Sequence, residues 1–291
     1  MYPFFNNFWI LLSKKLNKNQ PAFNVLKGYL KRILLLFAFW SLLYAPYNLY
    51  ALYTMKGNIA YALISYVQLI IFKSPSYMWY LIALAVATIP FCLMYKKYFR
   101  QLFIISIILY IFGTFGNSYK EIFDIKYFDI YLRYFLTTRN GVFFAPLFLC
   151  IGGKIQKSEK ILLNRKYIFI MLINSYLLFI YEVYFVQSQI QFGQDTSMYF
   201  MLPLVIYYLF VLSIRRNLDI KSTFLITFLR KASTGIYCSQ FGFIIIYEKF
   251  LILIGLYNNS AIYVFFLTIF SGIILTYLIT NTRNQFINKV I

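Results

Sequence analysis

The sequence predicts an all-α fold, a polytopic helical bundle integral to a membrane. Of the 291 residues, 62% are hydrophobic and only 12% are charged, whereas a soluble domain typically carries about 25% charged residues. The apolar runs are long and continuous, while the strands of a membrane barrel would alternate apolar and polar residues. Because the backbone must satisfy its own hydrogen bonds in lipid, these runs indicate helices.

The basic residues predict the orientation of the bundle. The formal net charge is +20, but the cations fall in short clusters between apolar runs. Such clusters set topology and do not form a nucleic-acid-binding stripe, so no nucleic-acid partner is expected. Twenty-one of the 28 Lys and Arg residues fall on the side that carries residues 14–32. Since Lys and Arg accumulate in cytoplasmic loops, both termini are predicted to lie in the cytoplasm of a bacterial cell, with the multi-pass bundle in its cytoplasmic membrane.

The apolar segments predict about eight spans in a single domain over residues 1–291, by a length rule of about 20 residues. Residues 1–12 are expected to form the second half of a helix whose first half is absent, and residues 14–32 a basic connection. The shorter segment 58–72 predicts an interfacial or re-entrant helix, and 117–138 a polar, aromatic loop on the outer side. The predicted spans are 33–54, 77–95, 101–116, 140–153, 167–186, 198–214, 233–255 and 261–281.

The residue types present limit the chemistry. Cys92, Cys150 and Cys238 all lie in apolar runs without metal-ligand spacing, so they are interpreted as small buried residues. The chain contains no histidine, which removes the commonest general base and the commonest metal ligand. It contains no nucleophile elbow, P-loop or dinucleotide fingerprint either. We therefore expect no metal site and no bound cofactor, and the catalytic residue stays unknown.

A polar stretch opens the apolar run that ends at Gly153. Its Arg139, Asn140 and Gly141 lie at the mouth of a membrane-length segment, where a charge is costly unless it faces protein, water or a ligand. Arg139 either snorkels to the lipid head groups or points into a polar pocket of the bundle, and we favour the pocket. Glu182 lies near the outer end of another span without a basic residue one turn away, which makes it a candidate partner of Arg139.

Two further pairs have both a structural and a functional interpretation. Lys31 and Arg32 lie at the cytoplasmic foot of a span, where they either anchor the helix or hold the phosphates of a cytoplasmic donor. Trp79 and Tyr80 begin a span at the outer interface. They belong either to an aromatic belt or to the same pocket as Arg139.

Several stretches, taken in order, resemble the membrane-bound acyltransferase 3 family in its Gram-positive O-acyltransferase form. They are Pro3-Phe4-Phe5, Tyr29-Leu30-Lys31-Arg32-Ile33, Trp79-Tyr80-Leu81, Thr137-Thr138-Arg139-Asn140-Gly141, Glu182 and Ser233-Thr234-Gly235-Ile236-Tyr237. The resemblance implies transfer of an acyl group, commonly acetyl, from acyl-CoA to a sugar hydroxyl of a cell-surface glycan or lipid-linked sugar. It implies a donor site at Lys31 and Arg32. It implies an acceptor site or pocket at Trp79, Tyr80, Arg139, Asn140, Gly141 and Glu182.

The chain departs from the family pattern where catalysis is expected. The family's first helix with its catalytic His is missing, which suggests an N-terminal truncation, and Tyr77 and Gln240 stand where many members carry His. We therefore expect the family's bundle in the membrane, with lipid as its surroundings, but little or no acyl transfer by this chain alone. Two alternatives stay open. One is a truncated, inactive relative, and the other is a polytopic transporter or flippase for a polyprenyl-linked glycan.

Overall fold

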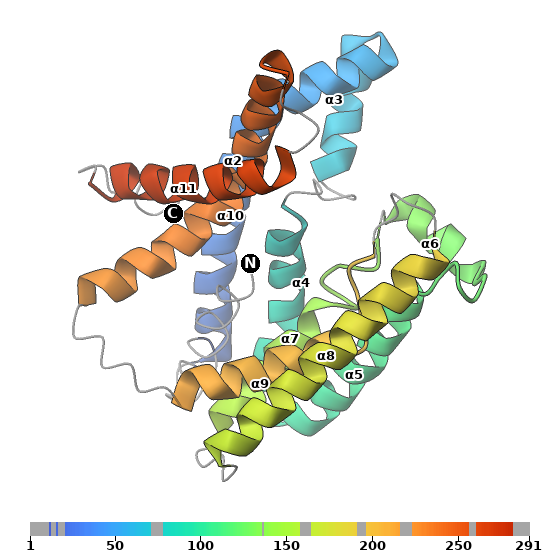
Figure 1. The fold of residues 1–291 in the computed structure, drawn as a ribbon, viewed down its shortest axis with the longest axis vertical. Coiled ribbons are helices and arrows are strands. Elements are labelled where there is room, and N and C mark those ends of the chain that lie inside the picture. Colours follow the sequence, from blue (N-terminus) through green and yellow to red (C-terminus); the bar gives the residue numbers. More distant parts are fainter. Residues whose placement is uncertain are drawn as a thin grey trace.

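The structure, a computed structural model, is built from helices (Figure 1). It describes residues 12, 16, 21–70, 78–135, 137–157, 164–190, 196–215, 223–255 and 260–281. These ranges contain ten helices and no strand, which confirms the all-α fold class. The helices are α2 (Ala22–Lys56), α3 (Ile59–Gln68), α4 (Trp79–Met94), α5 (Phe99–Phe115), α6 (Tyr127–Tyr134), α7 (Ala145–Lys157), α8 (Arg165–Gln189), α9 (Leu202–Arg215), α10 (Thr223–Leu253) and α11 (Ser260–Asn281).

Four of these helices contain segments long and apolar enough to cross a membrane. The segments are Ala22–Met55, Arg165–Gln189, Lys231–Leu253 and Ala261–Asn281. Helices α3, α4, α5 and α9 are also apolar but shorter, at 10–17 residues. The chain is thus a membrane protein by length and composition of its helices. Eight spans and the cytoplasmic position of both termini stay predictions.

Helix α2 begins eleven residues before the predicted span. Residues 22–32, which we expected to belong to a connection, form its first turns. Pro21 precedes the helix, where its fixed φ and missing N–H are tolerated, and residues 22–32 contain no proline. The helix ends at Gly57, whose φ of +66° is left-handed and whose N–H donates to the Tyr53 carbonyl at 2.8 Å. Lys31 and Arg32 therefore lie on α2 itself.

The predicted loop over 117–138 contains the short helix α6. Asp129 lies in its first turn and Arg133 in its last, so both charges complement the helix dipole. Asp129 also pairs with Lys120 at 2.5 Å, and the buried Phe128 anchors the helix to the bundle. The predicted interfacial segment 58–72 contains α3, which Asn58 caps by accepting the N–H of Ala60 at 2.8 Å. Residues 1–11 and 71–77 lie outside the described residues.

The helices form two groups joined by α2 and α4 (Figure 1). In one group α5 packs on α7 and α8 packs on α9, while α7 also contacts α4. In the other, α3 packs on α2 and α10 packs on α11. Helix α4 lies between them and is largely buried, with Tyr80, Leu84 and Phe91 each about 1% exposed. The start of α4, the end of α5 and the start of α7 meet the loops that carry the predicted pocket residues.

Candidate functional site

Arg139 points into protein and lies over an aromatic ring. Its guanidinium carbon is 4.5 Å from the centroid of the Trp79 ring, and the side chain is half-buried. The Arg139 backbone N–H donates to the Thr137 hydroxyl at 3.1 Å. A cation over an indole is stabilised by about 0.5–2 kcal/mol, more when water is excluded. This arrangement fits the pocket interpretation of Arg139.

Trp79 links the guanidinium to two buried tyrosines. The rings of Trp79 and Tyr80 meet edge to face at 5.9 Å, and those of Tyr80 and Tyr237 at 5.7 Å. Tyr80 is 1% exposed and Tyr237 is 5% exposed. Trp79, Tyr80, Arg139 and Tyr237, which we call the Arg139 cluster, thus come from α4, the turn before α7, and α10. Such a cluster holds one cation in surroundings from which water is largely excluded.

Asn140 and Gly141 shape the turn that carries Arg139. The Asn140 side-chain oxygen accepts the N–H groups of Val142 at 2.9 Å and Phe143 at 3.2 Å, and its amide donates to the Tyr131 hydroxyl at 2.5 Å. A Cβ on Gly141 would lie 2.5 Å from the Val86 Cβ, so the absent side chain allows the turn to touch α4. Both residues therefore set the conformation of the turn and its close approach to α4.

Glu182 caps a helix. Its carboxylate accepts the Tyr119 hydroxyl at 2.6 Å and the N–H groups of Phe200 at 2.7 Å and Met201 at 2.9 Å. These N–H groups lie just before α9, where a negative charge complements the helix dipole. The ion pairs found within the described ranges, Lys120–Asp129 and Lys126–Asp124, do not include Glu182. The structure thus shows Glu182 joining the loop after α5 to the loop before α9 and does not show the predicted pair with Arg139.

Asn117, just after α5, is a residue that the sequence analysis did not identify. Its side-chain oxygen accepts the N–H groups of Ser197 at 2.9 Å and Met198 at 3.0 Å, and its amide donates to the Thr137 hydroxyl at 3.3 Å. It therefore ties two loops to the end of α5. Nearby, burial and the bond to Glu182 raise the pKa of Tyr119, so its hydroxyl stays a donor. The only local signal was an Asn after Gly116, which is typical of a helix end.

The remaining predicted residues lie away from the Arg139 cluster. Lys31 and Arg32 are exposed on the first turns of α2, and the structure does not bring them to Arg139. Tyr77 lies outside the described residues. Gln240 lines a groove of about 390 Å³ between α10 and α11, whereas Tyr237, one turn earlier, contacts Tyr80.

Three relatives with assigned names show what the chain is similar to. An amino-acid racemase of Enterococcus faecalis is 36% identical over 150 residues, which are 49% of this chain and 21% of that protein. A serine/alanine racemase of Enterococcus gallinarum is 32% identical over 203 residues, 67% of this chain and 28% of that protein. A second amino-acid racemase of Enterococcus faecalis is 28% identical over 240 residues, 76% of this chain and 33% of that protein. The chain therefore spans about a third or less of the length of these relatives.

No solved structure matches the chain. A family model described as an acyltransferase domain matches residues 4–281, which is nearly the whole chain and includes all the residues of the Arg139 cluster. The chain belongs to the acyltransferase 3 family.

Proposed function

We propose that this protein transfers an acyl group from acyl-CoA to a sugar hydroxyl of a cell-surface glycan or lipid-linked sugar. The observation that carries the proposal is the Arg139 guanidinium, held over Trp79 beside Tyr80 and Tyr237 inside a chain of this family. Lys31 and Arg32 suit the phosphates of the donor on the cytoplasmic side. The acceptor approaches from the outer side, where the turn with Arg139 lies.

Acyl transfer needs stabilisation of charge on an oxygen atom. The hydroxyl oxygen of the sugar attacks the thioester carbon, the bond from carbon to sulfur breaks, and the CoA thiol leaves with the proton. Negative charge develops on the carbonyl oxygen as the new bond forms. A fixed cation in a water-poor site stabilises that charge, and loss of one such donor typically lowers kcat about 10²–10³-fold. Arg139 is the residue to which we assign this role.

The hydroxyl proton also needs an acceptor. The chain has no histidine, and Glu182 already accepts three hydrogen bonds from Tyr119, Phe200 and Met201. A well-placed general base typically contributes about 10²–10⁴-fold to the rate. We therefore expect transfer by this chain alone to be slower by about that factor than transfer by a family member that keeps its His.

The test measures incorporation of radiolabelled acetyl from acetyl-CoA into the glycans of membranes that contain the chain. Slow transfer is expected for the natural chain, and loss of that transfer for Arg139→Gln. Arg133→Gln is the matched control, because Arg133 is an exposed residue at the end of α6. Transfer that survives Arg139→Gln would remove Arg139 from the mechanism. Absence of transfer above empty membranes would contradict the proposed function.

The relatives named as racemases favour a second candidate function. On that view the chain is the membrane module of a system that handles serine or alanine, while a separate part carries out racemisation. The short share of those relatives that the chain matches supports this division. Its test is binding of radiolabelled L-serine or L-alanine to membranes with the chain. Saturable binding together with absent acyl transfer would favour this candidate, and absent binding would dismiss it.

A further inference from the structure

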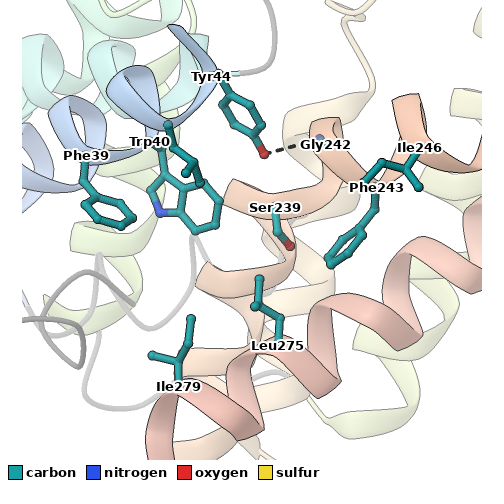
Figure 2. Close-up of a pocket in the computed structure, with 10 residues that line it drawn as sticks. Phe39, Trp40, Tyr44, Ser239, Gly242, Phe243, Ile246, Leu275 and Ile279 are labelled. Carbon is teal, nitrogen blue, oxygen red and sulfur yellow. Dashed lines mark hydrogen bonds between the residues drawn. The ribbon is translucent and has the colours of Figure 1, made fainter. Parts of the chain in front are cut away.

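A cavity of about 260 Å³ lies between α2, α10 and α11 (Figure 2). Its walls are almost wholly apolar and include Phe39, Trp40, Phe243, Ile246, Leu275 and Ile279. The pocket is open on one side, and one water needs only about 10–15 Å³ of such space. The cavity is therefore suited to an apolar ligand much larger than water.

Two polar groups on the cavity wall are buried without a hydrogen-bond partner among the described residues. They are the indole N–H of Trp40 and the hydroxyl of Ser239, in residues that are 4% and 3% exposed. In Figure 2 the Ser239 hydroxyl points toward the space between Phe243 and Leu275. A buried group left unsatisfied costs about 1–3 kcal/mol. Both groups donate hydrogen bonds, so a ligand with an acceptor oxygen would remove that cost.

The neighbouring polar groups of the same wall are already satisfied. The Tyr44 hydroxyl donates to the Cys238 carbonyl at 2.8 Å and accepts the Gly242 N–H at 3.3 Å, which Figure 2 marks. Tyr44 lies one turn after Trp40 on α2, and its hydroxyl holds α10 at Cys238 and Gly242, on either side of Ser239. The open donors are therefore a local property of the cavity and do not reflect loose packing of α2 against α10.

We propose that this cavity binds the acyl chain of the donor and that the chain is longer than acetyl. In the bound donor, before its carbonyl reaches Arg139, the alkyl carbons fill the apolar space and the carbonyl oxygen accepts from Ser239 or Trp40. This inference rests on the proposed acyl transfer. An acetyl group would leave most of the 260 Å³ empty, whereas each methylene placed there gains about 0.8 kcal/mol of transfer free energy, which is about fourfold in affinity.

The face of α2 that lines the cavity also carries a cation. Arg32, Leu36 and Trp40 follow one another at intervals of four residues, so they lie along one face of the helix. Arg32 precedes Trp40 by eight residues, which is about 12 Å along the axis. Arg32 can therefore hold a donor phosphate near the cytoplasmic end while the acyl chain extends toward the cavity.

The first test measures binding of unreactive ketone analogues of acyl-CoA to the whole protein in lipid nanodiscs. These analogues keep the carbonyl but replace the thioester sulfur by carbon. We expect affinity to rise from the acetyl to the hexanoyl analogue by about 10²-fold, at about fourfold for each of the added methylenes. Equal affinities for the two analogues would overturn the proposal.

Two variants test separately how the carbonyl oxygen and the alkyl carbons of the ligand contribute to its affinity. Ser239→Ala should lower affinity for the ketone analogues about two- to tenfold, and leave S-alkyl analogues that lack the carbonyl unchanged. Leu275→Phe should lower affinity for the hexanoyl analogue and leave the acetyl analogue unchanged. The controls are Ser188→Ala and Ile274→Phe, at exposed positions of α8 and α11, and both should bind as the natural chain does.

The outcomes distinguish this inference from the proposed function. A chain-length preference that Ser239→Ala and Leu275→Phe change, without any transfer of acyl groups, would support the cavity and contradict the transfer. Transfer with acetyl and longer donors alike, with no effect of either variant on binding, would support the transfer and overturn the cavity. The natural chain and Ser239→Ala decide the matter even if Leu275→Phe fails to fold.

Discussion

The loops that join α5 to α7 and α8 to α9 use polar side chains in the opposite way to the cavity between α2, α10 and α11. At these loops, Glu182 accepts three hydrogen bonds and Asn117 holds two loops together. In the cavity, Trp40 and Ser239 are equally removed from water but have no partner within the described ranges. Polar groups that bind one another build a frame, whereas buried donors left open indicate space for a ligand. By this comparison Glu182 belongs to the frame, and the cavity is the place where we propose that a ligand binds.

The largest expected effect comes from breaking the frame at Glu182. Glu182→Ala leaves the Tyr119 hydroxyl and two backbone N–H groups without their acceptor, and hydrogen bonds to a charged group contribute about 1.5–3 kcal/mol each. Because Glu182 is only half-buried, water can replace part of the lost bonds, and we expect the free energy of unfolding to fall by about 3 kcal/mol in total. Reversible denaturation of the purified protein in mixed micelles measures it. Asp124→Asn is the control, because Asp124 is exposed with a 3.8 Å contact to Lys126, and a comparable loss there would contradict the assignment.

A smaller loss of stability is expected from a substitution in the turn that carries Arg139. In Gly141→Ala the new Cβ would meet the Val86 Cβ at 2.5 Å and the Ala83 carbonyl at 2.7 Å, so α4 must shift. Such overpacking costs about 1–3 kcal/mol. Gly28→Ala on α2 is the matched control, since nothing lies within 4 Å of its Cβ, and alanine there should stabilise the helix by up to about 1 kcal/mol. Equal results for both glycines would show that the close approach of the turn to α4 is not needed.

Removing the hydroxyl groups of Thr138 and Ser239 tests the comparison between a buried donor with a partner and one without. Thr138 donates to the Gly113 carbonyl at 2.7 Å, so Thr138→Val should lower the free energy of unfolding by about 1 kcal/mol. Ser239 has no partner to lose, so Ser239→Ala should leave stability unchanged or raise it by up to about 1 kcal/mol without donor present. The same denaturation experiment measures both. Equal losses would mean that the Ser239 hydroxyl is bonded in the folded protein.

The smallest expected effect is a pH dependence at α6. The hydrogen bond and charge of Lys120 lower the pKa of Asp129 below its ordinary value of 3.8. A lowered folded-state pKa means that the contribution is fully present above pH 3.8 and is lost as pH falls below it through the folded value. Proteolysis of the 120–129 segment should therefore accelerate only below about pH 4. Lys120→Met should remove this dependence, and an unchanged pH profile in that variant would contradict the pair.

The sequence predicted the helices well and the contacts between loops poorly. Most long apolar runs became helices at nearly the predicted positions, because hydrophobic length and period are local properties. Residues 22–32 and 127–134 were misjudged, since their charges resemble a connection although each forms a helix. The family followed from short motifs in order, and the family match confirms it.

The site itself depends on distant pairs that local patterns do not contain. Asn117 binds partners 20 and 80 residues away. The sequence shows that Glu182 is an acid within an apolar span. Its role as a helix cap depends on the start of α9 lying beside it, which the sequence does not show. The cavity arises from residues near 40, 240 and 275 in the sequence. The unpaired donors of Trp40 and Ser239 can be identified only from the packed structure, which shows the side chains around them.

The position of Trp79 beneath a guanidinium has an optical consequence. The electric field of a fixed cation shifts the emission wavelength of an adjacent indole. If a bound acceptor moved Arg139, the emission wavelength of Trp79 would therefore change. The chain holds three tryptophans, of which Trp40 lies in the cavity wall and Trp79 in the Arg139 cluster. In the variant Trp9→Phe, the cavity and the Arg139 cluster would each contain one fluorescent tryptophan. Binding of the proposed donor and of the proposed acceptor could then be followed separately in unlabelled protein, from the emission wavelengths of Trp40 and Trp79.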